Sequence, residues 1–309
     1  MSELILHHYE ASPFAEKARR IMGLKGLSWR SVEVPMVMPK PDLMPLTGGY
    51  RKIPVLQIGA DIYCDTHLIA RELEQRFPDQ TLFPMGDRGI AYGIGAWSDH
   101  AFFDDILTIV MSSAENWEAR MREDRKQLFS EADWAGAKAK LAHARTQVRA
   151  HGALIEAQLS DGRRFLYGDA PGFVDLQASH MFWFCWRNFP DADEMFAGFE
   201  RVRAWEERIA ALGHGNVSPI ESGAAVEAAR LAESTTQPWV DPDDPQALPL
   251  GAIVDVAPDD YGKEPAQGEL LVYGPDRIAI RVEGERTGNI VIHFPRLGFR
   301  VDLSESQRS

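Results

Sequence analysis

The chain has 309 residues, of which 45% are hydrophobic and 26% are charged, and its formal net charge is −13. This length suits two or three domains, and the composition excludes wholesale disorder and a collagen-like repeat. Nucleic acid repels so negative a chain, and we expect no such partner. No apolar run approaches the ~20 residues that span a bilayer, and the first residues lack the basic segment of a secretory signal. We expect a cytoplasmic protein with no membrane partner.

Residues 1–80 alternate between strand and helix signals. Ser12 and Pro13 are typical of a helix start, because a serine side chain caps the free N–H groups of the first turn and proline fits its first position. Segment 35–49 is rich in proline and predicts a long irregular loop. The elements expected here are a strand at 4–9, a helix from 13 to about 23–26, a strand at 29–34, a hairpin at 54–64 and a helix that starts at Asp65 and Thr66.

Residues 86–213 carry apolar side chains at helical spacing, which predicts an all-helical unit. The expected helices fall within 88–118, 131–159, 173–187 and 196–212. Residues 214–249 are rich in Gly, Ser, Pro and Asp, which favours a linker with one short helix within 221–233.

Residues 250–304 change character again. Strand-like runs at 252–256, 269–273, 277–282 and 289–294 are separated by turns that contain Gly or Pro. Their regular spacing predicts a small antiparallel sheet or barrel. The expected fold class is therefore α+β multidomain, with units at 1–80, 86–213 and 250–304 and a linker at 214–249.

Three short segments of the first unit hold residues with chemistry of their own. Ser12 places a hydroxyl at a helix N-terminus, where it either stabilises a thiolate or serves only as a cap. Pro54, which follows Ile53 at a strand start, is a candidate cis proline beside backbone groups that pair with an extended peptide. Asp65 and Thr66 begin a helix whose free N–H groups attract a carboxylate, or they form another cap.

These segments resemble those of a known family. The runs Ala11–Arg19, Lys52–Leu56 and Tyr63–Ile69 resemble the amino-terminal domain of cytosolic glutathione S-transferases. Ser12 falls where the omega-like members have cysteine. The resemblance implies a thioredoxin-like fold for the first unit.

A later run extends the resemblance to the second unit. The run Leu166–Asp175 is similar to the helix-capping box of the family's second domain, with Gly172 in the place of Ser or Thr. The likeness covers roughly residues 1–213 and implies an all-helical second domain. The small antiparallel β domain at 250–304 lies outside the usual architecture of the family.

The resemblance implies that Ser12 stabilises the thiolate of glutathione, which would be the co-substrate. Serine in place of cysteine favours thiol activation over thioltransferase chemistry, because the latter needs a thiol nucleophile. The other implied glutathione contacts are Ile53 through its backbone to the cysteinyl part, Pro54 as the cis proline, Asp65 to the γ-glutamyl ammonium, Thr66 to the γ-glutamyl carboxylate, and Lys52, with Arg51 as a competitor, to the glycyl carboxylate.

The second substrate is expected between the two domains, against the first long helix of the helical unit. Tyr9 is also a rival hydroxyl for the thiol, because some classes of the family use a tyrosine near the end of the first strand; packing is its alternative role. The candidate contacts of the second substrate are Tyr9, Phe14, Trp97, His100, Phe103 and Asp104.

We therefore predict a glutathione transferase that acts on a small hydrophobic electrophile and forms a homodimer. No metal is expected, because His7 and His8 face opposite sides of a strand and the chain has only two cysteines. The alternative is a non-catalytic adaptor or ligand-binding protein with the transferase fold, which would bind a protein through residues 250–304.

Overall fold

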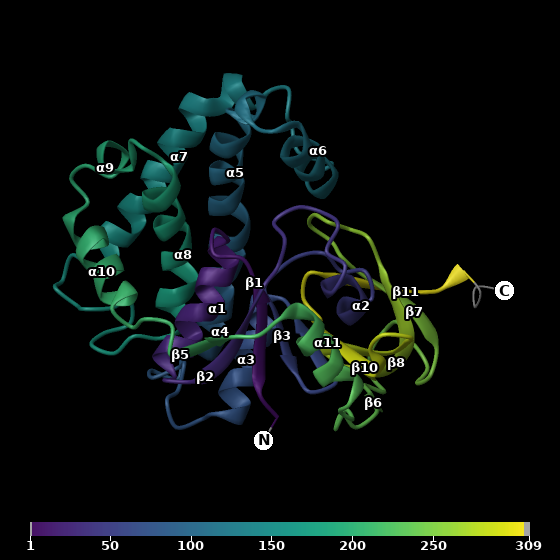
Figure 1. Ribbon diagram of the computed structural model, residues 1–309. Helices are drawn as coiled ribbons and strands as arrows, with labels where there is room; N and C mark the ends of the chain where they lie inside the picture. The colour runs from purple at the N-terminus through teal and green to yellow at the C-terminus, as the bar shows by residue number, and fades with distance from the viewer. Residues whose placement is uncertain (1, 306–309) are drawn as a thin grey trace.

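A computed structural model describes residues 2–305 (Figure 1). The first unit has the expected order of elements and contains a mixed sheet in which β1 pairs in parallel with β2 and antiparallel with β3, and β3 pairs antiparallel with β4. Its elements are β1 (Leu4–His8), α1 (Pro13–Leu24), β2 (Ser28–Glu33), α2 (Leu43–Thr47), β3 (Val55–Ile58), β4 (Asp61–Cys64) and α3 (Thr66–Arg76). This arrangement is the predicted thioredoxin-like fold.

Helix α2 lies inside the segment that we expected to be a loop throughout, so that expectation was wrong in part. Pro45 falls in the first turn of α2, where the N–H groups have no helical partner and proline is tolerated. Gly48, at φ 60°, ends the helix in the left-handed conformation.

The second unit is all-helical, as predicted. Its elements are α4 (Arg88–Ala96), the π-helical turn η1 (Trp97–Phe102), α5 (Phe103–Met111), the 3₁₀ turn η2 (Ala114–Asn116), α6 (Ala119–Leu128), α7 (Ala137–Gln158), α8 (Phe173–Asn188), α9 (Ala192–Met195) and α10 (Glu200–Ala210). Helix α6 was missed because most of its residues are charged or polar, which leaves too few apolar side chains to show a helical period. Within residues 2–305, no helix is both long and apolar enough to cross a bilayer.

The segment predicted as a linker contains the expected short helix and also two strands. Helix α11 (Ser222–Arg230) lies within the predicted range. Strand β5 (Asn216–Pro219) pairs in parallel with β2, and β6 (Trp239–Val240) pairs in parallel with β8 (Ala266–Tyr273). The segment is therefore paired with the strands of the first unit through β5 and with those of the last unit through β6.

The last unit is strand-rich and mostly antiparallel, as expected, and it has a fifth strand that we did not predict. Its strands are β7 (Ile253–Pro258), β8 (Ala266–Tyr273), β9 (Arg277–Gly284), β10 (Gly288–Pro295) and β11 (Phe299–Leu303). Strand β10 pairs in parallel with β4, so the strands continue the sheet of the first unit in the order β11-β7-β8-β9-β10-β4-β3-β1-β2-β5. The division of the chain at 1–80, 86–213 and 250–304 remains a proposal.

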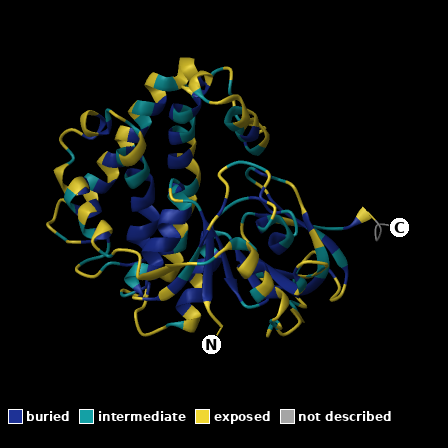
Figure 2. Cartoon of the chain, in the orientation of Figure 1, coloured by how far each residue is buried: buried dark blue, intermediate teal, exposed yellow. Residues whose placement is uncertain are grey.

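The extended sheet separates the two large hydrophobic cores of the described residues (Figures 1 and 2). Helices α1 and α3 lie between the sheet and the helical unit, and α1 packs against α8. Helices α2 and α11 pack on β10 and the neighbouring strands in the second core. The added strands thus complete a core that also contains residues of the first unit.

A buried polar contact joins β10 to β4. His293 Nε2 lies 3.0 Å from Asp61 Oδ1, and the His293 ring stacks on Tyr63 at 4.5 Å between centroids. The side chain of His293 is fully buried. Burial lowers the pKa of His293, while Asp61 opposes that change. The contact is a structural link between the two sheet regions.

Asp175 is the buried anchor of helix α8, and its removal is expected to destabilise the fold. Its carboxylate accepts hydrogen bonds from the backbone N–H groups of Leu166 and Gly172 and from the indole of Trp205, at 2.8, 2.9 and 2.8 Å. Asp175→Asn turns one acceptor oxygen into a donor that faces an N–H group. We expect a loss of about 1–3 kcal/mol in the free energy of unfolding, measured by urea denaturation. The exposed Asp169→Asn is the control, and equal stabilities would contradict this role.

Candidate active site

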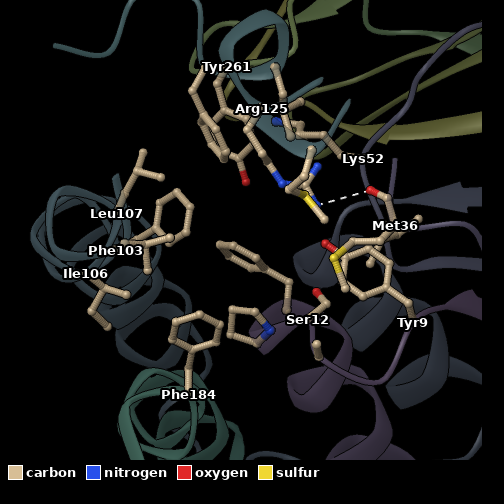
Figure 3. Close-up of a pocket in the computed structure, with 18 of the residues that line it drawn as sticks. Tyr9, Ser12, Met36, Lys52, Phe103, Ile106, Leu107, Arg125, Phe184 and Tyr261 are labelled. Carbon is tan, nitrogen blue, oxygen red and sulfur yellow. Dashed lines mark hydrogen bonds between the residues drawn. The ribbon is translucent and has the colours of Figure 1, made fainter. Parts of the chain in front are cut away.

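An apolar cavity of about 410 Å³ lies between the first unit, the helical unit and the loop that follows β7 (Figure 3). Most of its wall is aromatic or aliphatic, which suits an uncharged aromatic or aliphatic ligand. The apolar side chains of the wall are Ala11, Pro13, Phe14, Met36, Ile53, Phe103, Ile106, Leu107, Val110, Trp117, Met121, Leu128, Phe129, Trp134 and Phe184.

Ser12 caps α1 and lines this cavity. Its Oγ accepts a hydrogen bond from the backbone N–H of Ala15 at 3.2 Å, and its hydroxyl lies beside the phenol of Tyr9. Pro13 and Ala15 follow in the first turn, where the helix dipole favours negative charge. Ser12 is therefore a cap and a possible donor to an anion at the same time.

Tyr9 lines the same cavity as Ser12. Burial raises the pKa of Tyr9, and the Ser12 hydroxyl is among the groups that oppose this change. Tyr9 is therefore a neutral phenol at ordinary pH. The two hydroxyls predicted as rivals lie together, and either can donate a hydrogen bond into the cavity.

A second hollow of about 330 Å³ adjoins the first and contains the predicted contacts for the γ-glutamyl end of glutathione. Pro54, Asp65 and Thr66 line it, and the Ile53–Pro54 bond is cis, as the resemblance implies. The residues common to both spaces are Phe14, Lys52, Ile53 and Tyr261. A molecule longer than either hollow can therefore extend from Asp65 to Ser12 past Ile53.

Asp65 and Thr66 begin α3 with free polar atoms that line this hollow. Asp65 adopts φ 74°, and its Oδ1 accepts a hydrogen bond from the backbone N–H of His67 at 2.8 Å. The second carboxylate oxygen of Asp65 and the hydroxyl of Thr66 make no hydrogen bond to any residue within 2–305. Both groups remain available to a ligand.

The two basic residues before Ile53 are already paired with carboxylates. Lys52 Nζ lies 2.7 Å from Asp260 Oδ1 and 4.3 Å from the ring centre of Tyr261. Arg51 lies 2.5 Å from Asp124 Oδ1 and is almost fully buried. Lys52 is therefore the better placed of the two to meet a ligand, although it already pairs with the loop after β7.

Lys40 is a basic residue of the cavity wall that the sequence analysis missed. It is 4% exposed, and its ammonium donates a hydrogen bond to the carbonyl of Arg51 at 3.0 Å. Burial lowers the pKa of Lys40 to about 8, and the nearby Arg125 and Arg51 act in the same direction. Lys40 stands in the segment read as an irregular loop, where no local pattern indicated a buried cation.

All predicted contacts of the second substrate except Trp97 line the main cavity or a hollow next to it. Phe14 and Phe103 lie on the main cavity, whereas His100 and Asp104 line a neighbouring hollow toward α5. Trp97 is corrected: its indole donates a hydrogen bond to His151 Nδ1 at 2.9 Å, so it packs toward α7. Trp97 is the first residue of the π-helical turn. Side chains in such a turn point in other directions than α-helical spacing predicts, so the sequence did not indicate where Trp97 faces.

A buried network of charged and polar side chains connects the start of α3 to α1 and to the helical unit. Lys17 donates to Asp99 Oδ2 and to Gln177 Oε1, both at 2.6 Å, and His67 Nε2 lies 3.2 Å from Asp99. Although burial opposes it, Lys17 and then His180 hold the pKa of Asp99 well below its usual range. The network fixes the start of α3 against the helical unit. Among residues 2–305, no group of three or more His, Cys, Asp or Glu side chains is arranged so that it could hold a metal ion.

Comparison with known proteins assigns the first two units. Residues 6–81 match the family model "Glutathione S-transferase, N-terminal domain", and residues 137–208 match "Glutathione S-transferase, C-terminal domain". The solved structure of a GST-like protein from Pseudomonas syringae is 37% identical, covers 98% of this chain and 100% of its own, and superposes with a TM-score of 0.78. The chain belongs to the glutathione S-transferase family.

Other members of the glutathione S-transferase family cover less of this chain. Glutathione S-transferase U1 of Arabidopsis thaliana is 24% identical over 213 residues, which is 63% of this chain and 83% of the relative. A rice glutathione S-transferase solved in complex with glutathione is 22% identical, covers 68% of this chain and 86% of its own, and has a TM-score of 0.50. The latter likeness shows the shared fold. The Pseudomonas protein, by contrast, matches this transferase-family chain along nearly its whole length, added strands included.

Proposed function

We propose that this chain is a glutathione transferase that activates the thiol of glutathione for attack on a small hydrophobic electrophile. The observation that supports this most is the place of Ser12. Its hydroxyl caps α1 on the wall of an apolar cavity, and that cavity adjoins the hollow with Asp65 and Thr66. The thiol of glutathione and an apolar electrophile would thus meet beside the hydroxyl of Ser12.

Glutathione would lie across both spaces. Its γ-glutamyl ammonium would meet the free oxygen of Asp65, its γ-glutamyl carboxylate would meet Thr66 and the start of α3, and its cysteinyl backbone would pair with Ile53. The glycyl carboxylate would reach the cations Lys52 and Lys40. The rice relative supports this placement only as a protein of the same fold that was solved with glutathione.

Ser12 would act by holding the sulfur as a thiolate. The thiol proton leaves to solvent, and the Ser12 hydroxyl donates a hydrogen bond to the sulfur anion, aided by the first turn of α1. The thiolate electron pair then forms a bond to the electrophilic carbon. In a substitution, the leaving group departs with the electron pair of the bond that breaks.

The proposed electrophile is apolar and aromatic because the cavity wall is. The rings of Phe14 and Phe103 meet edge to face at 5.3 Å between centroids, and both line the cavity with Ser12. Such a wall favours a flat ring over an extended polar chain. The natural electrophile would be a small aromatic compound.

The decisive test combines binding with turnover. Calorimetric titration with S-methylglutathione should give saturable binding, and conjugation of glutathione to 1-chloro-2,4-dinitrobenzene should be saturable in both substrates. Binding without turnover would support the ligand-binding alternative, and a folded protein without either would support the adaptor. The expected homodimer is tested separately by sedimentation equilibrium.

Lys40 gives the proposed site a characteristic pH dependence. Its pKa is lowered to about 8 in the free protein, and a glycyl carboxylate beside it would raise that pKa toward its usual value. Binding of S-methylglutathione, which has no ionisable thiol, should therefore take up as much as about one proton near pH 9 and weaken as the pH rises above about 8.

Calorimetry in two buffers of different ionisation enthalpy measures this uptake. Lys40→Met should abolish the uptake and raise the Kd about tenfold, as expected for a lost hydrogen bond to a charged group. If the wild-type heats do not depend on the buffer, Lys40 is not a glutathione contact.

A further inference from the structure

We propose that Tyr261, contributed by the added strand region, is a specificity-determining residue of the active site that donates a hydrogen bond to an oxygen of an aromatic second substrate. The inference rests on the proposed function, because it assigns a class of electrophile to the same cavity. Tyr261 lies in the loop between β7 and β8, and this loop is outside the two matched transferase domains.

The position of Tyr261 is the first support. It lines the cavity with Ser12, the adjoining hollow with Asp65, and the hollow beside Asp104. Tyr261 is thus a wall common to all three spaces. A second substrate in contact with sulfur at Ser12 would lie within reach of this ring.

The loop is fastened on both sides, so the ring has a fixed place. Asp260 binds Lys52 of the first unit at 2.7 Å, and the N–H of Gly262 donates to the carbonyl of Leu128 in the helical unit at 3.0 Å. Lys263 pairs with Glu131 at 2.7 Å. The loop of the added strands therefore joins the first unit to the helical unit beside the cavity.

The ring of Tyr261 is held by neighbours on the cavity wall. It packs on Phe129 at 4.6 Å and is stacked on Phe103 at 5.7 Å between centroids. The ammonium of Lys52 lies over the ring at 4.3 Å. These contacts fix the ring plane and leave the hydroxyl as the one polar atom that the residue presents to the cavity.

The hydroxyl of Tyr261 has no hydrogen-bond partner within the described range 2–305, and Figure 3 shows it pointing into the cavity. Burial raises the pKa of Tyr261 well above its usual value, and the carboxylates Asp260, Asp99 and Asp65 act in the same direction. The group is therefore a neutral donor. An apolar cavity that contains an unpaired donor favours a ligand with a matching acceptor.

This chemistry narrows the electrophile to an aromatic compound with a carbonyl-like oxygen. Its ring would pack among Phe14, Phe103 and Phe129, and its oxygen would accept from Tyr261. The reacting carbon would face Ser12. An aromatic of the same shape without the oxygen would leave the hydroxyl of Tyr261 unpaired and would be turned over less well.

The test compares Tyr261→Phe with wild type on two probes of similar shape, 4-acetylbenzyl chloride and 4-isopropylbenzyl chloride. In both, glutathione sulfur forms a bond to the benzylic carbon, and chloride leaves with the electron pair. Tyr261→Phe should lower kcat/KM about fivefold for the acetyl probe, as one neutral hydrogen bond predicts, and less than twofold for the isopropyl probe. Affinity for S-methylglutathione should stay within twofold.

Unreactive analogues make the result independent of turnover. Tyr261→Phe should bind 4-methylacetophenone more weakly than wild type does, and it should bind 4-isopropyltoluene with nearly unchanged affinity. The matched control is Tyr273→Phe, because the hydroxyl of Tyr273 forms hydrogen bonds with Gln246 and Arg296 away from the cavity. This variant should leave the preference for the acetyl over the isopropyl compound unchanged, both in turnover and in binding.

The outcomes separate the two proposals. An equal change for the acetyl and isopropyl compounds overturns the role of the Tyr261 hydroxyl, whatever the turnover. Absence of S-methylglutathione binding and of conjugation overturns the proposed function, whereas the split in binding of the unreactive pair would still support the hydrogen bond from Tyr261.

Discussion

Ser12→Ala is expected to raise the apparent pKa of the conjugation rate by about 1–2 units. The hydroxyl donates a hydrogen bond to a charged sulfur, and such a bond contributes about 1.5–3 kcal/mol. One pKa unit corresponds to 1.36 kcal/mol, so the loss of the bond raises the pKa of the bound thiol by about 1–2 units. Below pH 7, kcat/KM should fall about 10–100-fold, whereas affinity for S-methylglutathione should change little. The measurement is kcat/KM from pH 5 to 9.

Two further variants separate the chemistry of Ser12 from its role as a helix cap. Ser12→Thr keeps the donor and the cap and should keep most of the activity. Ser12→Gly loses the donor but costs the helix only a few tenths of a kcal/mol, so its pH profile should match that of Ser12→Ala. Tyr9→Phe tests the neighbouring hydroxyl. An unshifted profile in Ser12→Ala together with a shifted one in Tyr9→Phe would transfer the role to Tyr9.

The parts of the fold and site that the sequence predicted are those that short local patterns specify. The cap at Ser12 and the helix start at Asp65 each depend on a few neighbouring residues, whereas the cis state of Pro54 was implied by the family resemblance. The structure brings all three residues to adjoining hollows. Their order along the chain sufficed to predict that they converge, because strand and helix ends of a small sheet meet at one edge.

The parts that the sequence did not predict depend on contacts between distant segments. Nothing in the run of β10 indicates that its partner is β4, about 230 residues earlier, because an apolar strand is compatible with many partners. Lys40 is buried only because Arg51 and the cavity wall surround it. Tyr261 reaches the site through a loop whose placement follows from that sheet pairing.

Asp65→Asn is expected to weaken glutathione binding about 10–100-fold through the loss of one charge. The change is nearly isosteric, and asparagine keeps an oxygen that accepts from the N–H of His67, so the start of α3 should survive. Asparagine has nearly the same shape as aspartate, so it meets the same backbone conformation, φ 74° and ψ 141°, with no added bulk. What is lost is the negative charge on the oxygen that faces the hollow, and with it a charge-assisted bond to the γ-glutamyl ammonium.

A ligand that lacks the γ-glutamyl amino group identifies this bond specifically. Wild type should bind S-methylglutathione about 10–100-fold more tightly than its deamino analogue, and Asp65→Asn should bind both with nearly equal affinity, since the two changes remove the same interaction. Asp259→Asn is the matched control, because Asp259 is an exposed carboxylate on the rim of the same hollow. It lowers the local negative charge without touching the proposed partner and should keep the preference for the amino group. Equal discrimination by wild type and Asp65→Asn would mean that the ammonium lies elsewhere, and the orientation of glutathione proposed here would then be reversed or wrong.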